Sequence, residues 1–163
     1  MAEEFKIPDS KRSKKKRYEI LLQQIESLLE NERDVIANMS NIASVLKTTF
    51  NFLWVGFYIV KGKQLVLGPF QGPVACTRIE EGKGVCGTAW QNKTSVVVPD
   101  VSKFAGHIAC CSESKSEIVI PGILKKKVIF VLDIDSSALN TFDEVDRFNL
   151  EHIVSNLLKY SDF

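Results

Sequence analysis

The sequence lacks the features that would place this chain in a membrane, in an oxidising compartment or around a metal ion. No apolar stretch reaches the roughly 18 residues that span a bilayer, and residues 1–9 contain no apolar core of a secretory signal. There are two histidines, four cysteines and no Cys-x2-Cys pair, so the usual spacing of a structural zinc site is missing. We therefore expect a cytoplasmic protein with no bound metal and no structural disulfides.

Positive charge is concentrated in one short segment. Residues 11–17 carry six lysines and arginines, without which the net charge of +1 would become −5. Such a run at a terminus is typical of a solvated tail, and nuclear import or nucleic-acid binding is the alternative. The length of 163 residues suits one domain. We expect a flexible basic extension over residues 1–17 and a single folded domain over 18–163.

The hydrophobic pattern predicts helices near both ends of the chain and strands between them. Apolar residues recur at helical spacing over residues 18–29, 34–50 and 142–159. Asp34 is the expected N-cap of the second helix, and Phe148 is among the inward positions of the last one. A short helix should follow Gly82 and end near Asn92.

Strands are expected at 52–60, 64–67, 95–98, 117–120 and 127–134. Residues 68–73 are expected to be irregular. This order of elements predicts an α+β domain with an antiparallel sheet of about six strands flanked by helices.

The cysteines lie in segments that do not have the pattern of core strands. Cys76, Cys86 and the adjacent pair Cys110 and Cys111 stand near glycine or alanine in loop-like surroundings. Burial as a small apolar side chain is the common fate of a free cysteine and suits one or two of them. His107 lies only three residues from Cys110, so a cysteine-protease arrangement is weakly supported. For the remaining positions the surroundings favour reactive thiols.

Acidic side chains end one of the apolar strands. Asp133 and Asp135 should share a face with Ile129 and Val131, and Glu117 begins the preceding strand. Two acids on an apolar face resist ionising together, so one pKa should be raised and one carboxylic acid kept as a proton donor near neutral pH. For Asp135, capping of the following turn is an equally good explanation.

Aromatic side chains flank a glycine on the first strand. Trp54, Gly56 and Tyr58 lie on one face, and the glycine leaves a gap between two large rings. Core packing is the usual meaning of such a pattern. The alternative is a slot for a small apolar group such as a methyl.

Six short motifs between residues 68 and 136 carry a resemblance that runs from about residue 18 to residue 158. They are Gly68-Pro-Phe-Gln-Gly-Pro-Val-Ala-Cys76, Gly82-Lys-Gly-Val-Cys-Gly-Thr-Ala89, Pro99-Asp-Val101, Gly106-His-Ile-Ala-Cys110, Ser116-Glu-Ile-Val119 and Val131-Leu-Asp-Ile-Asp-Ser136. Each alone is a weak signal. Together and in this order they make the chain resemble the free methionine-(R)-sulfoxide reductases, which are catalytic GAF domains.

The resemblance assigns roles by position. Cys110 matches the catalytic cysteine, Cys76 the resolving cysteine, and Cys86 a third cysteine that can take part in disulfide exchange. The family's substrate pocket is matched by three acids and two aromatic residues, namely Glu117, Asp133, Asp135, Trp54 and Tyr58. Asp135 or Glu117 is the acid expected to protonate the sulfoxide oxygen.

The function that the resemblance implies is reduction of free L-methionine-(R)-sulfoxide to L-methionine. Cys110 would become a sulfenic acid and then form a disulfide with Cys76. Thioredoxin, supplied by NADPH and thioredoxin reductase, is the implied reductant, with no bound cofactor. A homodimer through the N-terminal helices is expected, and neither a membrane nor a nucleic-acid partner. The alternative is a non-catalytic GAF module that binds a small molecule or senses redox state.

Three positions depart from the family pattern. Cys111 stands where an acid usually follows the catalytic cysteine, and this bears on the rate more than on the type of reaction. Lys125 and Lys126 replace the usual Asp-Gly hairpin turn, and Phe130 replaces a strand glycine. The last two bear on turn geometry and packing.

Overall fold

The described part of the chain folds into four α-helices and one sheet of six strands. The computed structural model describes residues 5–108 and 110–163. Along the chain the elements are α1 (Lys14–Leu29), α2 (Val35–Phe50), β1 (Trp54–Lys61), β2 (Gln64–Gln71), β3 (Arg78–Glu80), α3 (Gly84–Asn92), β4 (Val96–Val98), a 3-10 turn (Val101–Lys103), β5 (Ser116–Leu124), β6 (Lys127–Ser136) and α4 (Glu144–Tyr160). The strand order is β3-β2-β1-β6-β5-β4, antiparallel throughout. This confirms the predicted α+β domain.

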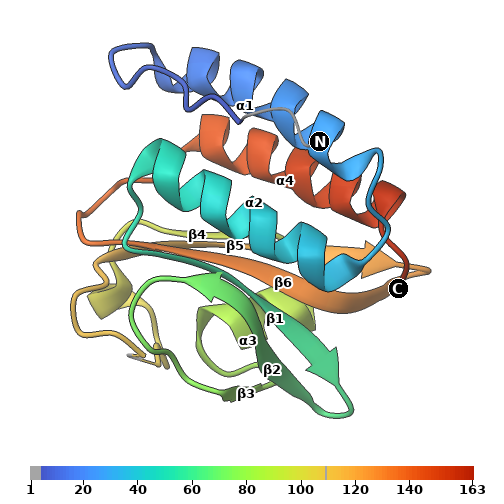
Figure 1. Cartoon of the computed structure of the whole chain (residues 1–163). Helices are drawn as coiled ribbons and strands as arrows, with labels where there is room; N and C mark the ends of the chain where they lie inside the picture. The colour runs from blue at the N-terminus through green and yellow to red at the C-terminus, as the bar shows by residue number, and fades with distance from the viewer. Residues whose placement is uncertain (1–4, 109) are drawn as a thin grey trace.

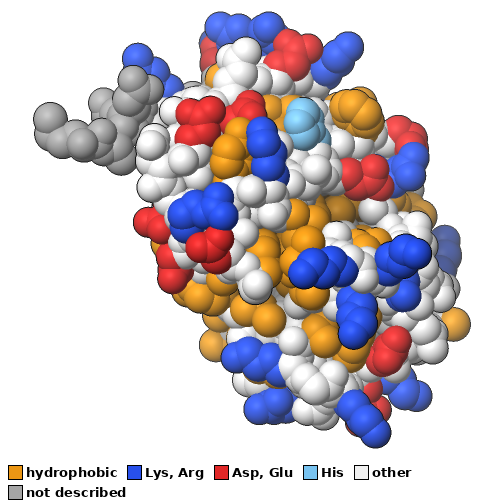
Figure 2. All heavy atoms as spheres, turned by 90° about the vertical axis from the view of Figure 1, so that its right-hand side faces the viewer, with side chains coloured by type: hydrophobic (Ala, Val, Ile, Leu, Met, Phe, Trp, Pro, Cys, Tyr) orange, Lys and Arg blue, Asp and Glu red, His pale blue; other side chains and the backbone are white. Residues whose placement is uncertain are grey.

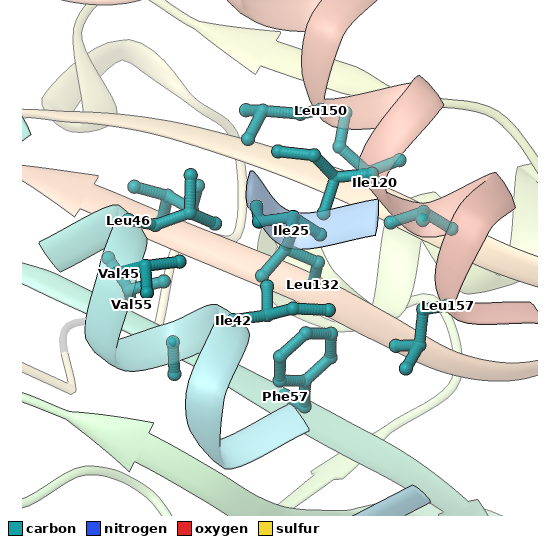
Figure 3. Close-up of a cluster of buried hydrophobic side chains, with 14 of the residues drawn as sticks. Ile25, Ile42, Val45, Leu46, Val55, Phe57, Ile120, Leu132, Leu150 and Leu157 are labelled. Atoms are coloured by element: carbon teal, nitrogen blue, oxygen red, sulfur yellow. The ribbon is translucent and has the colours of Figure 1, made fainter. Parts of the chain in front are cut away.

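The two faces of the sheet are covered unequally. Helices α2 and α4 lie on one face with α1 packed against both, and α3 lies on the opposite face (Figure 1). Figure 3 shows side chains of the helix layer, among them Ile42 and Leu157, meeting Phe57 and Leu132 of the central strands. Burying such a side chain contributes about 1.5–3 kcal/mol, so this face supplies much of the driving force for folding.

Two bulges change the strand pattern that simple alternation predicts. Strand β2 continues through Gly68 and Pro69, which were expected to be irregular, and the β1–β2 register shifts there, between Gly56 and Tyr58. Proline has no N–H for the ladder, which suits a bulge. In β6 the residue Ile129 is extra, so it packs with the helix-side cluster instead of sharing the face of the two aspartates.

The prediction that Phe148 faces inward is wrong, since 70% of this residue is exposed. The buried positions of α4, among them Leu150, Ile153 and Leu157, follow a three- and four-residue spacing that leaves Phe148 on the solvent side. The expected N-cap of α2 is confirmed, because Asp34 accepts a hydrogen bond from the backbone N–H of Ala37.

Helix α1 begins at Lys14 rather than at Tyr18, so the predicted extension overlaps it by four residues. Lys14 Nζ lies 2.5 Å from Oδ2 of Asp146, whose other oxygen accepts a hydrogen bond from the Tyr18 hydroxyl. Because Asp146 is fully buried in α4, these contacts tie the end of the basic run to the domain. Flexibility of the preceding residues stays a prediction.

The two family departures that affect packing are accommodated locally. Lys125 and Lys126 both have positive φ, 49° and 67°, as the tight β5–β6 hairpin requires. The ring of Phe130 lies across Gly122, its direct partner on β5, and fills the space that a side chain there would need. The large side chain of Phe130 on β6 is thus accommodated because its partner on β5 is a glycine, which has no side chain.

Apolar side chains are visible in the middle of the molecular face at the hairpin ends, between charged groups (Figure 2). Ile36, Ile123 and Phe163 are among the large apolar residues with exposed surface. Homodimer formation stays a prediction.

Among the described residues, no helix combines the length and the apolar character needed to cross a bilayer.

Candidate active site

A small cavity lies on the α3 side of the sheet, where the motif-bearing segments meet. The space in it that the centre of a water molecule can reach is about 30 Å³. Its lining comes from strands β1, β3, β5 and β6, from the start of α3, and from two loops. The lining residues are Trp54, Tyr58, Val74, Ala75, Ile79, Lys83, Gly84, Val85, Cys86, His107, Ile108, Cys110, Cys111, Ser114, Glu117 and Asp135.

Cys110, a residue of the cavity wall, forms a disulfide with Cys76. The two residues are 34 positions apart in sequence, and their Cα atoms are 5.4 Å apart, a normal separation for a disulfide. Cys111 is free and half-buried beside it. The structure therefore joins the two cysteines that the resemblance marks as catalytic and resolving, and their separate roles stay predictions.

Strand register brings the acids and one aromatic ring together. Trp54 of β1 pairs with Asp135 of β6, which pairs with Glu117 of β5. Residues in register on neighbouring strands point to the same face, so these three side chains form one row across the sheet, here called the site row. The next row toward α3 carries Gly56 and Asp133.

The gap that Gly56 leaves is occupied by the indole of Trp54 in this structure. A side-chain carbon at Gly56 would collide with that ring. Trp54 and Tyr58 stack with ring centroids 5.9 Å apart, and both line the cavity. Any slot for a methyl group would therefore lie beside the rings rather than between them.

The two aromatic residues also hold the loop that carries Cys76. The Trp54 indole N–H donates a hydrogen bond to the carbonyl of Pro73 at 3.1 Å, and the Tyr58 hydroxyl donates to the carbonyl of Cys76 at 2.9 Å. These bonds run from a central strand to the disulfide-bearing segment, so they position Cys76 against the sheet.

Burial dominates the electrostatics of the three acids. It raises the pKa of Glu117 well above the usual value, and the neighbouring charge of Asp135 adds to the effect. Burial, followed by the charges of Glu117 and Asp135, raises the pKa of Asp133 in the same way. Burial also raises the pKa of Asp135, while a hydrogen bond from the Ser114 hydroxyl and the charge of His107 act in the opposite direction. The expected raised carboxyl pKa is thus present, and on more than one acid.

Cys86 and Asp133 lie behind the exposed part of the site. Cys86 stands in the first turn of α3 and is 3% exposed. Burial, and then the charges of Asp133 and Glu117, raise the pKa of its thiol well above the usual value, which keeps it protonated and weakly nucleophilic. Asp133 is the one predicted pocket residue that is not among the lining residues described above. The roles predicted for both residues stay predictions.

Two residues near the acids, Ser114 and His107, were not predicted from the sequence to contact them. Ser114 donates its hydroxyl hydrogen to Asp135, and His107 Nε2 lies 3.6 Å from Oε2 of Glu117. His107 is therefore a neighbour of an acid here, whereas its sequence position suggested only proximity to Cys110. Both residues come from a loop without periodicity, and only the spacing Ser114-x2-Glu117 could have drawn attention to one of them.

The first residue of α3, Gly84, lies close to the loop that carries His107 and Ile108. Gly84 has φ of +59°, and a side-chain carbon there would press on Ile108. The N-cap residue, Lys83, makes no side-chain hydrogen bond to the helix, so N–H groups of the first turn are left for another acceptor. Together the residues offer an exchangeable disulfide, buried proton donors, two aromatic rings and a helix N-terminus.

Relatives of the chain cover nearly its whole length. GAF domain-containing protein A of Dictyostelium discoideum is 56% identical over 158 residues, 96% of this chain and 99% of that protein. Free methionine-R-sulfoxide reductase of Saccharomyces cerevisiae is 43% identical over 150 residues, 86% of this chain and 83% of that protein. The crystal structure of free methionine-R-sulfoxide reductase from Neisseria meningitidis in complex with its substrate has a TM-score of 0.92 and 47% identity, covering 95% and 94% of the two chains. No family model matches.

Proposed function

Because this chain belongs to the family of GAF-fold free methionine-(R)-sulfoxide reductases, we propose that it reduces free L-methionine-(R)-sulfoxide to L-methionine by thiol chemistry. The observation that carries this proposal is the disulfide that Cys76 forms with Cys110, a residue in the wall of a cavity that is also lined by Glu117 and Asp135. In the proposed reaction, a disulfide so placed is the oxidised state that forms after one substrate has been reduced and before the reductant acts.

The first step transfers oxygen from the substrate to the enzyme. The Cys110 thiolate attacks the sulfoxide sulfur, and Glu117 or Asp135 supplies a proton to the sulfoxide oxygen. Methionine leaves as the thioether, and the oxygen stays on Cys110 as a sulfenic acid. The substrate sulfur is reduced by two electrons and Cys110 is oxidised by two.

The second step closes the disulfide and the third opens it. The Cys76 thiol attacks the sulfenic sulfur, water leaves, and the bond between the two cysteines forms. A dithiol donor such as thioredoxin then reduces the disulfide by thiol exchange and becomes a disulfide itself. NADPH and thioredoxin reductase complete the cycle, and no bound cofactor is required.

Recognition of a free amino acid follows from the charges around the cavity. A carboxylate of the site row can pair with the substrate ammonium. The uncapped N-terminus of α3 suits the substrate carboxylate, since its N–H groups and helix dipole favour an anion. Trp54 and Tyr58 provide the apolar surface for the methylsulfinyl end. A peptide-bound methionine sulfoxide lacks both free charges, so it should be a poor substrate.

The alternative is a non-catalytic GAF module that binds a small molecule and senses redox state. It would share the cavity and could use the same disulfide. The presence of buried proton donors beside the disulfide favours the enzyme, because a sensor needs none.

The test is NADPH consumption with thioredoxin, thioredoxin reductase and separated methionine sulfoxide isomers. We expect consumption and stoichiometric methionine with the free R isomer only. No consumption with any isomer, together with retained ligand binding, would favour the sensor. Equal turnover of an N-acetylated or peptide substrate would contradict the recognition scheme.

A further inference from the structure

Three metal-binding atoms converge at the wall of the cavity, two of them from residues that line it. The Cys86 sulfur and one carboxylate oxygen each from Glu117 and Asp133 all lie within 4.8 Å of one another. They come from α3, β5 and β6, so three separate elements position them. All three residues are nearly fully buried, with 3%, 5% and 6% of their surface exposed. Exposed acidic clusters are commonly solvated, whereas this one is enclosed by protein.

One of these carboxylates has an unused acceptor. Asp133 Oδ1 is buried and has no hydrogen-bond partner among the described residues. Most buried polar atoms in proteins do have one, because an unpartnered acceptor costs about 1–3 kcal/mol. A cation bound by Asp133 beside Cys86 and Glu117 would give this carboxylate a charged partner.

The donor set favours one class of ion. One sulfur and two carboxylate oxygens suit a borderline-soft divalent ion such as Zn²⁺, whereas Mg²⁺ and Ca²⁺ prefer oxygen alone. Tetrahedral zinc with bonds of about 2.0–2.3 Å separates its ligand atoms by about 3.5 Å, so small side-chain rotations would close the present spacing. His107 Nε2 lies 3.6 Å from Glu117 but is not part of this three-residue cluster, so the fourth position is left for a water molecule.

Cys86 can supply a thiolate to this cluster while the disulfide is present. Cys76 and Cys110 are bonded to each other and cannot ligate as thiolates, while Cys86 is free. Glu117 and Cys86 also line the cavity, so the cluster adjoins it directly.

We propose that Cys86, Glu117 and Asp133 form a binding site for a thiophilic divalent cation in the disulfide form of the protein. Binding replaces the protons of the three ligands, and no electron transfer is involved. The site goes beyond the proposed reaction, which needs no metal. An ion there would occupy groups that the reaction uses, so it would act as an inhibitor rather than a cofactor.

Cobalt(II) titration of the disulfide form tests this proposal without measuring activity. The oxidised protein is first verified by intact mass and peptide mapping, and Co²⁺ then serves as the spectroscopic substitute for zinc. We expect near-ultraviolet absorption from a cobalt–thiolate bond, intense visible bands of a four-coordinate ion, and displacement of both by Zn²⁺.

Variants identify the ligands. Cys86→Ser should lose the thiolate band, and Asp133→Asn should weaken cobalt binding by about tenfold or more. The matched control, Cys111→Ser, removes the other free thiol and should keep the band. Circular dichroism establishes that each variant is folded.

Absence of a thiolate band in the oxidised wild-type protein would overturn the proposal, and this measurement depends on no variant. A band that survives in Cys86→Ser but disappears in Cys111→Ser would also overturn it, since the ion would then sit at the surface thiol. Loss in Cys86→Ser with retention in Cys111→Ser supports the site whether or not the protein reduces methionine sulfoxide.

Discussion

The two faces of the sheet bury different chemistry, although the same strands supply both. Under the helices, a row across β1, β6 and β5 consists of Val55, Ile134 and Ile118, which are all fully buried and apolar. One residue along each strand, on the α3 face, lies the site row with its two acids. Burial of the first row stabilises the folded state. Burial of the ionised carboxyls in the second row is unfavourable, and this cost is expressed in their raised pKa values.

This difference separates stability from chemistry within one sheet. Alternation along a strand sends neighbouring residues to opposite faces, so a residue that matters for folding lies next to one that matters for reaction. Changes on the helix face should therefore act on stability, and changes on the α3 face on turnover.

The largest expected effect is loss of all methionine formation in Cys110→Ser with the fold intact. Serine cannot supply an anionic nucleophile at neutral pH without an activating base. Cys76→Ser should still release about one methionine per enzyme in a single turnover, because the first step needs only Cys110, and then stop. Product quantification after mixing with excess substrate checks both, with circular dichroism as the folding control. No single-turnover product from Cys76→Ser would mean that the two assignments are exchanged or wrong.

On the helix face, Leu132→Ala should destabilise the protein by about 2–5 kcal/mol, since it leaves a cavity between Phe57 and Ile120. Urea unfolding of the reduced protein measures the change. Turnover per folded molecule should stay close to the wild-type value. Phe148→Ala, at an exposed position, is the control and should change stability by less than about 0.5 kcal/mol. A large loss of turnover with little loss of stability in Leu132→Ala would break the division between the faces.

An intermediate effect is expected for Glu117→Gln, which should raise the stability of the protein near pH 7 and lower its turnover. The pKa of Glu117 is raised in the folded state, so its contribution to stability is fully present below the unfolded pKa of about 4.3 and is lost as pH rises through the folded pKa. The variant should therefore be more stable than wild type near pH 7, by about 1.4 kcal/mol for each unit of upward shift. Its turnover should fall by roughly 10²-fold if Glu117 is the proton donor.

Urea unfolding between pH 4 and 8 measures the stability half of this prediction, and Glu81→Gln, at an exposed acid, is the control. A Glu117→Gln protein with the same pH dependence as wild type would show that burial of this carboxyl carries no cost.

The smallest effect is expected at Cys111. Cys111→Ser should preserve both turnover and the disulfide between Cys76 and Cys110, because adjacent cysteines can bond only through a strained small ring. Cys111→Asp restores the acid usual in the family and should change the rate by no more than several-fold. A like charge next to Cys110 disfavours its thiolate, and any help from the acid in holding the loop opposes this. Peptide mapping after one oxidising turnover checks the pairing, and a dominant bridge between Cys110 and Cys111 would contradict it.

Much of the fold could be predicted from the sequence because it depends on short-range periodicity. Helical spacing located α1, α2 and α4, and alternation located Asp133 and Asp135 on one face. The same reasoning was wrong for Ile129 and Phe148. A bulge moved the first, and the true phase of the helix, set by packing on the sheet, exposed the second.

The sequence by itself determined which elements form and which residue types are available to the site, since propensity and periodicity act between neighbours in the chain. Only the tertiary structure decided which of them meet. It joined Cys76 to Cys110 across 34 residues, aimed Ser114 at Asp135, and put Asp133 behind the cavity. The physical reason is that these contacts and the raised pKa values of the acids depend on burial by distant segments, which no local pattern encodes.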